Sequence, residues 1–182
     1  MKKFIEVYDN VIPKELVKGY KNLLLSGKND YIQWSYKTNI SENTSYNFPG
    51  FSHVFFRKNP EFSNDYSNYF NQILNIFCFN RNIQIKDITL GRIFLQLPYY
   101  KDKTIRSAIH IDSTLSHWVC LYYVNNSDGD TIFYDNNKKE IKRISPKKGR
   151  IVFFDGSIFH SANSSSKKHR AVINFNFTGK IL

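Results

Sequence analysis

The residues of this chain with the clearest chemical potential are His110 and Asp112, which stand two positions apart just before the apolar run HWVCLYYVN. Side chains two apart on an extended strand point to the same face, so both groups are expected to reach the same interior. A buried, ionised carboxylate needs a cation or good hydrogen bonds as compensation. Three interpretations follow for the pair: metal ligation, a base partner, or exposure at the end of a strand.

A third ligand is available at His160, which lies 50 residues beyond His110 and follows the segment GRIVFFDG after a turn. Two imidazoles and one carboxylate form the facial triad that holds non-haem Fe(II) and leaves positions open for a bidentate cosubstrate and dioxygen. Structural zinc is less favoured, because the chain has no CxxC or HxxxH cluster. Taken alone, His160 would equally be a turn histidine with satisfied hydrogen bonds.

The segment RAVINFNFT, residues 170 to 178, alternates between an apolar and a polar face. The apolar face is expected to pack against helices and consists of Ala171, Ile173, Phe175 and Phe177. The other face carries Arg170, Val172, Asn174 and Asn176, so it predicts a binding cavity between two sheets. The guanidinium fork of Arg170 suits the distal carboxylate of a diacid. The alternative is a surface arginine that follows the basic loop SSSKKHR.

These residues require a scaffold of strands, and the chain supplies one after two helices. A helix is expected from Pro13 to Gly27 and a second, buried one from residue 64 to 79. Short strands follow in the segments DITLGRIFLQL, AIHID, HWVCLYYVN, TIFYD, EIKRI, GRIVFFDG and RAVINFNFT. The pattern predicts an α+β, mainly β fold: a double-stranded β-helix (jelly roll, cupin-like) with two N-terminal helices packed on one sheet.

Length and composition fit one domain. The 182 residues, 41% of them hydrophobic, predict a single domain over 1–182, with a helical N-terminal part about 1–85 and a jelly-roll core about 86–180. Neither of the two cysteines belongs to a CxxC pair, so a disulfide framework is not expected. The sequence shows no apolar stretch of signal-peptide or membrane-spanning length, which predicts a cytoplasmic protein without a membrane partner.

The net charge of +11 is concentrated in the segment KKEIKRISPKKGR, residues 138 to 150. Such a run is usually a solvated face. It leaves nucleic acid as a minority partner and defines the alternative function: a non-catalytic jelly-roll module that binds nucleic acid through its basic surface.

The set His110-x-Asp112, His160 and Arg170 resembles the Fe(II)- and 2-oxoglutarate-dependent dioxygenases, most closely their prolyl 4-hydroxylase-like branch. The resemblance spans about Thr89 to Thr178. The stretch CLYYVN looks like the strand after HxD in the oxygen-sensing prolyl hydroxylases, LQLPYY resembles the strand before it, and SPKKGRIVFFDG looks like the strand that leads to the distal histidine.

This resemblance implies Fe(II), 2-oxoglutarate and O2 as cofactor and cosubstrates, and it allows ascorbate. It implies that His110, Asp112 and His160 hold iron at the catalytic centre and that Arg170 orients 2-oxoglutarate. By the same match, Tyr100, Tyr123 and Asn174 contact the cosubstrate. Val172 departs from the family, because many relatives have the Ser of an Arg-x-Ser pair at this position.

The resulting hypothesis is a hydroxylase that acts on an unactivated C–H bond. A prolyl or other residue in a peptide or protein is the favoured substrate, because the closest look-alikes act on prolyl residues and the aromatic-rich segment 31–62 offers a cover for an extended chain. A small-molecule substrate stays open. A base-repair substrate is disfavoured, since that branch usually has a second arginine where this chain has Asn176.

Overall fold

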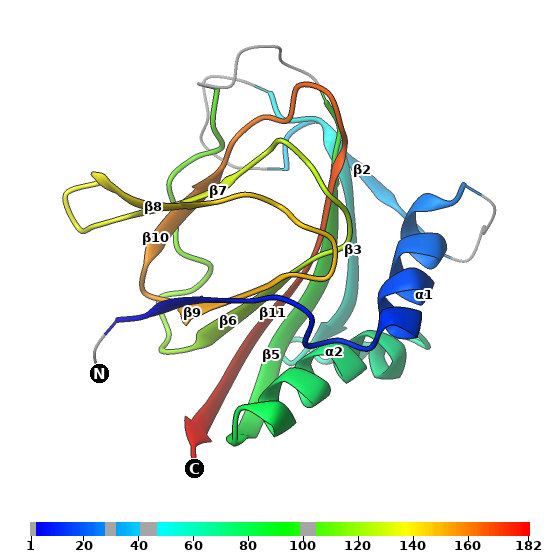
Figure 1. Cartoon of the computed structure of the whole chain (residues 1–182), viewed down its shortest axis with the longest axis vertical. Helices are drawn as coiled ribbons and strands as arrows, with labels where there is room; N and C mark the ends of the chain where they lie inside the picture. The colour runs from blue at the N-terminus through cyan, green and yellow to red at the C-terminus, as the bar shows by residue number, and fades with distance from the viewer. Residues whose placement is uncertain (1–2, 28–31, 41–46, 99–104) are drawn as a thin grey trace.

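The computed structural model describes residues 3–27, 32–40, 47–98 and 105–182. Tyr100, expected at the cosubstrate, lies outside these described residues, as do residues 31 and 41–46 of the aromatic-rich segment. The described residues form two β-sheets and two α-helices (Figure 1).

The larger sheet forms the framework of the molecule. Its spatial order is β1 (Ile5–Tyr8), β9 (Ile151–Asp155), β6 (Trp118–Tyr123), β11 (Arg170–Ile181), β5 (Ile83–Gln96), β3 (Gly50–Arg57) and β2 (Ser35–Lys37), with β4 (Phe62–Ser63) paired to β3. All of these pairings are antiparallel. The long strands β5 and β11 lie side by side at the centre, so residues from distant parts of the chain meet there.

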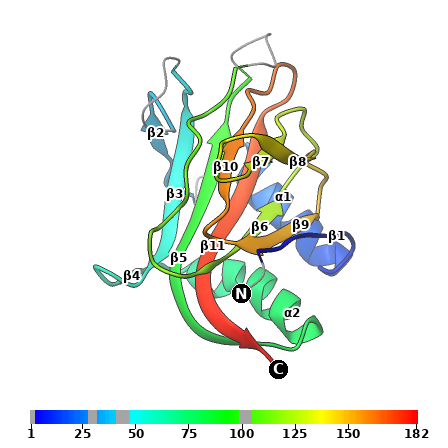
Figure 2. The same ribbon diagram turned by 90° about the vertical axis from the view of Figure 1, so that its left-hand side faces the viewer.

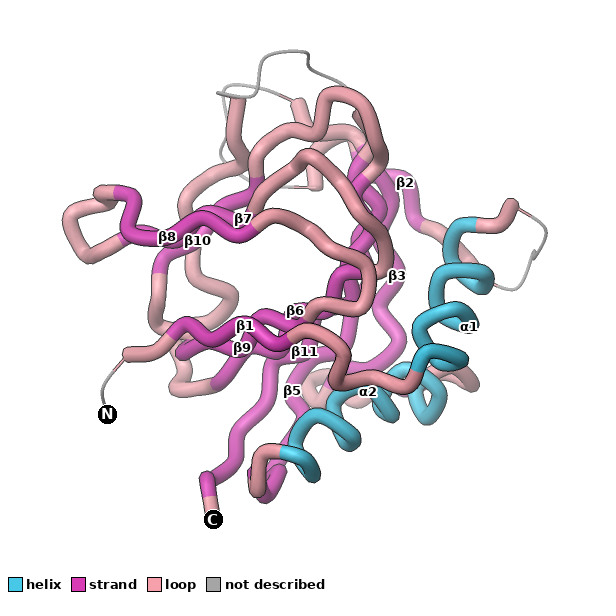
Figure 3. The backbone as a smooth tube through the Cα atoms, viewed as in Figure 1, coloured by secondary structure: helices cyan, strands magenta, loops and turns pink. Residues whose placement is uncertain are grey.

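Two helices, α1 (Lys14–Leu25) and α2 (Ser67–Asn80), cover one face of the larger sheet, as Figure 3 shows in cyan. Pro13 stands immediately before α1, and Gly27 adopts a positive φ of 65° just after it, as the sequence predicts for the two ends of this helix. The helices bury residues such as Tyr20 and Phe70 against Ile173 and Phe175 of β11. The expected position of the helices on one sheet is therefore confirmed.

The smaller sheet lies over the opposite face of the larger one, as the views in Figure 1 and Figure 2 show. It consists of β10 (Phe159–Ala162), β7 (Thr131–Tyr134) and β8 (Glu140–Ile144) in that order. A second apolar cluster joins the sheets, with Phe133 and Ile144 packed among Leu121, Phe154 and Val172. Two facing antiparallel sheets with helices on one side confirm the predicted jelly-roll architecture.

The segment AIHID does not form the predicted strand. Only His110 pairs with another strand, through an isolated bridge in which its N–H and C=O bond the C=O and N–H of His160 at 3.0 and 2.9 Å. His160 lies on β10, a short strand that pairs with β7 and that the sequence analysis does not predict. The apolar residues of AIHID are only partly buried, so they do not supply the packing that would extend the pairing.

Neither α1 nor α2, the helices in the described part of the chain, combines the length and the apolar character that a membrane crossing requires.

Candidate metal centre

His110, Asp112 and His160 meet at one point between the two sheets. One ligand atom from each residue can be chosen so that all three atoms lie within 4.8 Å of one another. His160 comes from β10, whereas His110 and Asp112 come from the irregular segment that runs beside this strand. The structure thus brings together the three residues that the sequence singles out as metal ligands.

Backbone carbonyls orient both imidazole rings. Nδ1 of His110 lies 2.9 Å from the carbonyl oxygen of Ala108, and Nδ1 of His160 lies 3.1 Å from that of Ile158. A carbonyl only accepts hydrogen bonds, so a neutral ring in this position has its proton on Nδ1 and its lone pair on Nε2. These contacts therefore present Nε2 of both rings as metal ligands, in the way that outer partners orient ligating histidines.

The carboxylate of Asp112 is held at both oxygens, and its side chain is only 2% exposed. Arg92 of β5 donates to one oxygen at 2.6 Å, and the Nδ2 amide of Asn174 donates to the other at 3.0 Å. Burial alone would raise the pKa of Asp112, but the charge of Arg92, the nearby imidazoles and the Asn174 hydrogen bond outweigh it and hold that pKa below its ordinary value. Asp112 is therefore an ionised ligand at neutral pH.

Burial has the opposite effect on the neighbouring imidazole. It lowers the pKa of His160 to about 4, against a smaller opposing effect of Asp112. His160 is therefore neutral at neutral pH, which is the form that binds a metal. Two imidazole nitrogens and one carboxylate oxygen on one side of a cavity match the donor set that non-haem Fe(II) takes.

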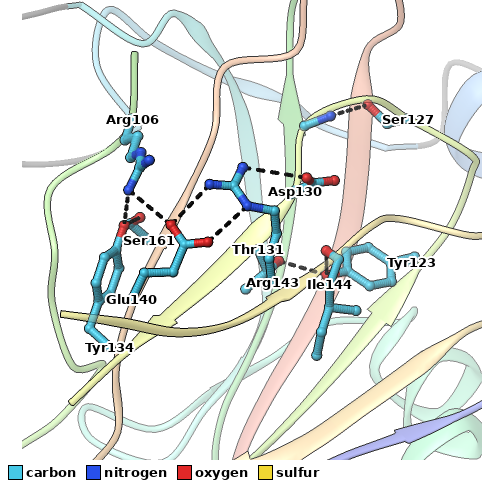
Figure 4. A network of polar contacts seen from close by, with 11 residues as sticks. Arg106, Tyr123, Ser127, Asp130, Thr131, Tyr134, Glu140, Arg143, Ile144 and Ser161 are labelled. Carbon is cyan, nitrogen blue, oxygen red and sulfur yellow. Dashed lines mark hydrogen bonds and ion pairs between the residues drawn. The ribbon is translucent and has the colours of Figure 1, made fainter. Parts of the chain in front are cut away.

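A polar network fixes the segment that leads to His110 (Figure 4). Arg106 donates to the hydroxyl of Tyr134 at 3.2 Å and to Glu140 at 3.3 Å, and the Tyr134 hydroxyl lies 2.8 Å from that of Ser161 on β10. Arg143 also binds Glu140, at 3.0 Å. The network ties the smaller sheet to the segment before the HxD pair, which positions His110 beside His160.

A cavity of about 730 Å³ opens beside the three ligands. Arg170 lies in its wall and is 6% exposed. Its guanidinium donates to the hydroxyl of Thr131 at 2.8 Å, and its buried Nε has no hydrogen-bond partner among the residues that the structure describes. No carboxylate forms an ion pair with Arg170 within the described ranges. Burial lowers the pKa of Arg170, yet arginine stays charged in proteins, so this cation is suited to an anionic ligand in the cavity.

A comparison with protein families decides the assignment. Residues 95–178 match the model of the 2OG-Fe(II) oxygenase superfamily, where 2OG is 2-oxoglutarate. These residues belong to that superfamily. The resemblance that the sequence motifs indicate is thereby confirmed.

Solved structures of 2OG-Fe(II) oxygenases share the fold. A prolyl hydroxylase from Trichoplax adhaerens, in complex with a hypoxia inducible factor peptide fragment, aligns with a TM-score of 0.65 and 15% identity, over 95% of this chain and 82% of that one. The viral collagen prolyl hydroxylase of Paramecium Bursaria Chlorella virus-1 aligns with a TM-score of 0.59 and 13% identity, over 96% of each chain. An alpha-ketoglutarate-dependent epimerase from nogalamycin biosynthesis aligns with a TM-score of 0.62 and 12% identity, over 97% of this chain and 78% of that one. Among curated proteins, no sequence matches this chain.

The residues at this site fit the groups that the superfamily implies. The donor set suits Fe(II), and the unpartnered Nε of the buried Arg170 suits one end of the 2-oxoglutarate dianion. The cavity volume lies within the range of small-molecule sites, about 300 to 1,000 Å³.

The structure describes two other residues that are expected at the cosubstrate, Asn174 and Tyr123, and both have hydrogen-bond partners within the protein. Asn174 lines the cavity, but its amide nitrogen donates to Asp112 and also to Oδ1 of Asn176, at 3.3 Å. Tyr123 is fully buried and does not line the cavity; its hydroxyl donates to Thr131 at 2.6 Å. In this geometry Asn174 orients the carboxylate of Asp112, and Tyr123 orients the hydroxyl of Thr131.

Sequence reasoning missed Arg92 and Thr131. Register pairs Arg92 with Asn174 and Gln96 with Arg170, so the cavity faces of β5 and β11 lie directly side by side. The alternation of Arg92, Phe94 and Gln96 in GRIFLQ was a usable signal, since it repeats the polar face of β11. Thr131 begins the apolar strand β7, and nothing in its local sequence indicates a contact with Arg170.

Much of the basic segment 138–150 is engaged with neighbouring groups of the same chain. Lys147 and Arg150 both bind Asp9, at 3.0 and 2.9 Å, and Arg143 binds Glu140. Lys142 donates to the carbonyl of Ile5 at 2.9 Å. These contacts leave fewer cations for phosphates, so the segment fits a solvated, locally paired surface better than a nucleic-acid site.

Proposed function

We propose that this protein is an Fe(II)- and 2-oxoglutarate-dependent dioxygenase that hydroxylates an unactivated C–H bond, most readily in a prolyl or other residue of a peptide or protein. One observation carries the proposal: a metal donor set shares the wall of one cavity with a buried arginine that forms no ion pair with any described carboxylate. Family membership supports the reaction class, and two solved relatives, a collagen prolyl hydroxylase and a prolyl hydroxylase with a bound peptide, support the substrate class.

Each residue has a defined task in this proposal. His110 and His160 offer Nε2 and Asp112 offers a carboxylate oxygen to Fe(II), while Arg170, supported by Thr131, binds the distal carboxylate of 2-oxoglutarate. Bound Fe(II) and 2-oxoglutarate would supply the activation of O2 and the oxidation of the C–H bond, with succinate and carbon dioxide as co-products. The apolar walls at Leu121, Phe154 and Val172 limit the access of water to this place.

The first experiment is an anaerobic titration of the metal-free protein with Fe(II) and then 2-oxoglutarate. We expect the visible charge-transfer band of a chelated complex in the wild type and no band in Asp112→Ala. Asp87→Ala is the matched control, because this exposed carboxylate pairs with Lys58 outside the cavity.

Turnover gives the second half of the test. Succinate formation should disappear in Asp112→Ala and persist in Asp87→Ala. A folded wild type that shows no band, or an Asp112→Ala variant that keeps both the band and turnover, would show that the site assignment is wrong.

A further inference from the structure

The cavity of this protein has more positive than negative charge in its wall. Among the described residues that line the cavity, Arg92, Lys138 and Arg170 are cationic and only Asp112 is anionic, which leaves a net charge of two positive when histidines are counted as neutral. Fe(II) would add two positive charges and 2-oxoglutarate would remove two. The loaded cavity therefore keeps a positive charge, and the ligand that complements it is an anion.

The two arginines lie at different ends of this cavity. Arg92 faces Asn174 and Gln96 faces Arg170 across the β5–β11 pair, so the two arginine positions are offset by four residues, about 13 Å along the strands. The ligand cluster lies at the Arg92 end, because both Arg92 and Asn174 contact Asp112. A cosubstrate that extends from Arg170 to the metal would end there, and it would leave Arg92 for a different ligand.

The guanidinium of Arg92 has N–H donors that the hydrogen bond to Asp112 does not engage. Its side chain is 25% exposed, its guanidinium carbon lies 4.8 Å from the ring centroid of Phe94, and its Nε is buried without a hydrogen-bond partner. Within the described part of the chain, its hydrogen bond to Asp112 engages one nitrogen of a group that carries five N–H donors. A metal at Asp112 would share the charge of that carboxylate, so Arg92 would be less neutralised in the loaded protein than without metal.

We propose that Arg92 is a specificity-determining residue that binds a carboxylate of the substrate next to the reacting C–H bond. This inference rests on the proposed function and narrows its substrate to molecules with an acidic group. A planar guanidinium recognises a carboxylate through two parallel hydrogen bonds, which also orients the molecule. The carboxylate comes either from an acidic side chain in a peptide or from a free carboxyl terminus or small acid, and the test separates these sources.

The test uses matched neutral and charged probes on the anaerobic Fe(II)- and 2-oxoglutarate-loaded full chain. N-acetyl-aspartic acid α-amide is compared with N-acetyl-asparagine α-amide for the side-chain source, and N-acetyl-proline with N-acetyl-prolinamide for the terminal source. Binding is measured by calorimetry and by the shift of the charge-transfer band. We expect the charged member of at least one pair to bind at least ten times more tightly than its neutral partner.

Variants then assign that preference to Arg92. Arg92→Gln should remove the preference of acid over amide, and Arg92→Lys should keep part of it, since lysine retains the charge without the planar fork. Arg150→Gln is the control, because Arg150 pairs with Asp9 and does not line the cavity. If Arg92 served only as a counter-ion of Asp112, Arg92→Gln would weaken Fe(II) binding and leave the acid preference unchanged.

Three results would overturn the inference. The first is that neither acid binds better than its amide, and the second is that the preference survives in Arg92→Gln. In both cases an intact charge-transfer band would leave the proposed function standing. The third is the absence of that band in the wild type, which would contradict the proposed function and this inference together.

Discussion

The two faces of strand β11 perform different tasks although their residues alternate one by one. On the helix face, Ile173, Phe175 and Phe177 are fully buried in the larger apolar cluster. On the cavity face, Arg170 and Asn174 are almost as inaccessible, yet each keeps a buried polar atom that has no hydrogen-bond partner in the described part of the chain. Unpaired buried polar groups are costly, so the cavity face gives up stability in a way that the helix face does not.

This difference implies that stability and ligand binding can be changed separately on one strand. A residue pointing to the helices should affect the unfolding free energy and leave the affinity of the folded protein for its ligands unchanged. A residue pointing to the cavity should do the reverse. Replacements on β11 and on the neighbouring strand β6 test the separation.

The largest effect is expected on the helix face. Phe175→Ala removes a fully buried ring that contacts Phe55 at 5.5 Å between centroids, so it should lower the unfolding free energy by about 3 to 5 kcal/mol. Phe175→Leu fills more of the space and should cost about 1 to 2 kcal/mol. Urea unfolding of the metal-free protein measures both values. A folded Phe175→Leu variant that no longer binds 2-oxoglutarate would show that the two faces are coupled.

The next effect is expected at Arg170. Arg170→Gln should weaken 2-oxoglutarate binding by at least about 30-fold, the equivalent of about 2 kcal/mol for a lost buried, charge-assisted hydrogen bond. Stability should change little, because no described carboxylate loses an ion-pair partner. The titration of the Fe(II)-loaded protein by the charge-transfer band measures the affinity. An unchanged affinity, with the control Arg150→Gln also unchanged, would remove Arg170 from the cosubstrate site.

The sequence predicts the helix face better than the cavity face, for a physical reason. Apolar alternation in residues 170 to 178 identifies the buried face of β11, and Pro13 and Gly27 mark the ends of α1, because these signals depend on local geometry. The significance of Arg92 arises only when β5 pairs with β11 and brings it opposite Asn174, a contact between residues 82 positions apart. Taken alone, an arginine on a strand is as consistent with a solvent-exposed position as with a position in the cavity.

Local pattern also fails where the backbone leaves regular structure. The strand predicted for AIHID is a single bridge at His110, and its partner His160 lies on β10, a short strand that the sequence analysis does not predict. The three ligands nevertheless meet, since the bridge and the Arg106 network position the irregular segment. The hydroxyl of Tyr123 donates to Thr131, a contact that no spacing in the sequence reveals, and the cosubstrate contact expected of Tyr123 stays a prediction.

The smallest effect comes from two adjacent tyrosines of β6 that point to opposite faces. Tyr123→Phe removes the hydroxyl that holds Thr131, the partner of Arg170, so it should raise the KM for 2-oxoglutarate about fivefold, equivalent to about 1 kcal/mol, with kcat unchanged.

Tyr122→Phe is the matched control. Its ring packs 5.8 Å from that of Tyr20 on the helix side, and its hydroxyl is buried without a partner among the described residues. Tyr122→Phe should therefore keep the wild-type KM and should not lose stability, because the unpaired hydroxyl contributes no hydrogen bond. Equal changes of KM in both variants would mean that the hydroxyl of Tyr123 does not act through Thr131 and that the two faces of β6 are not separate.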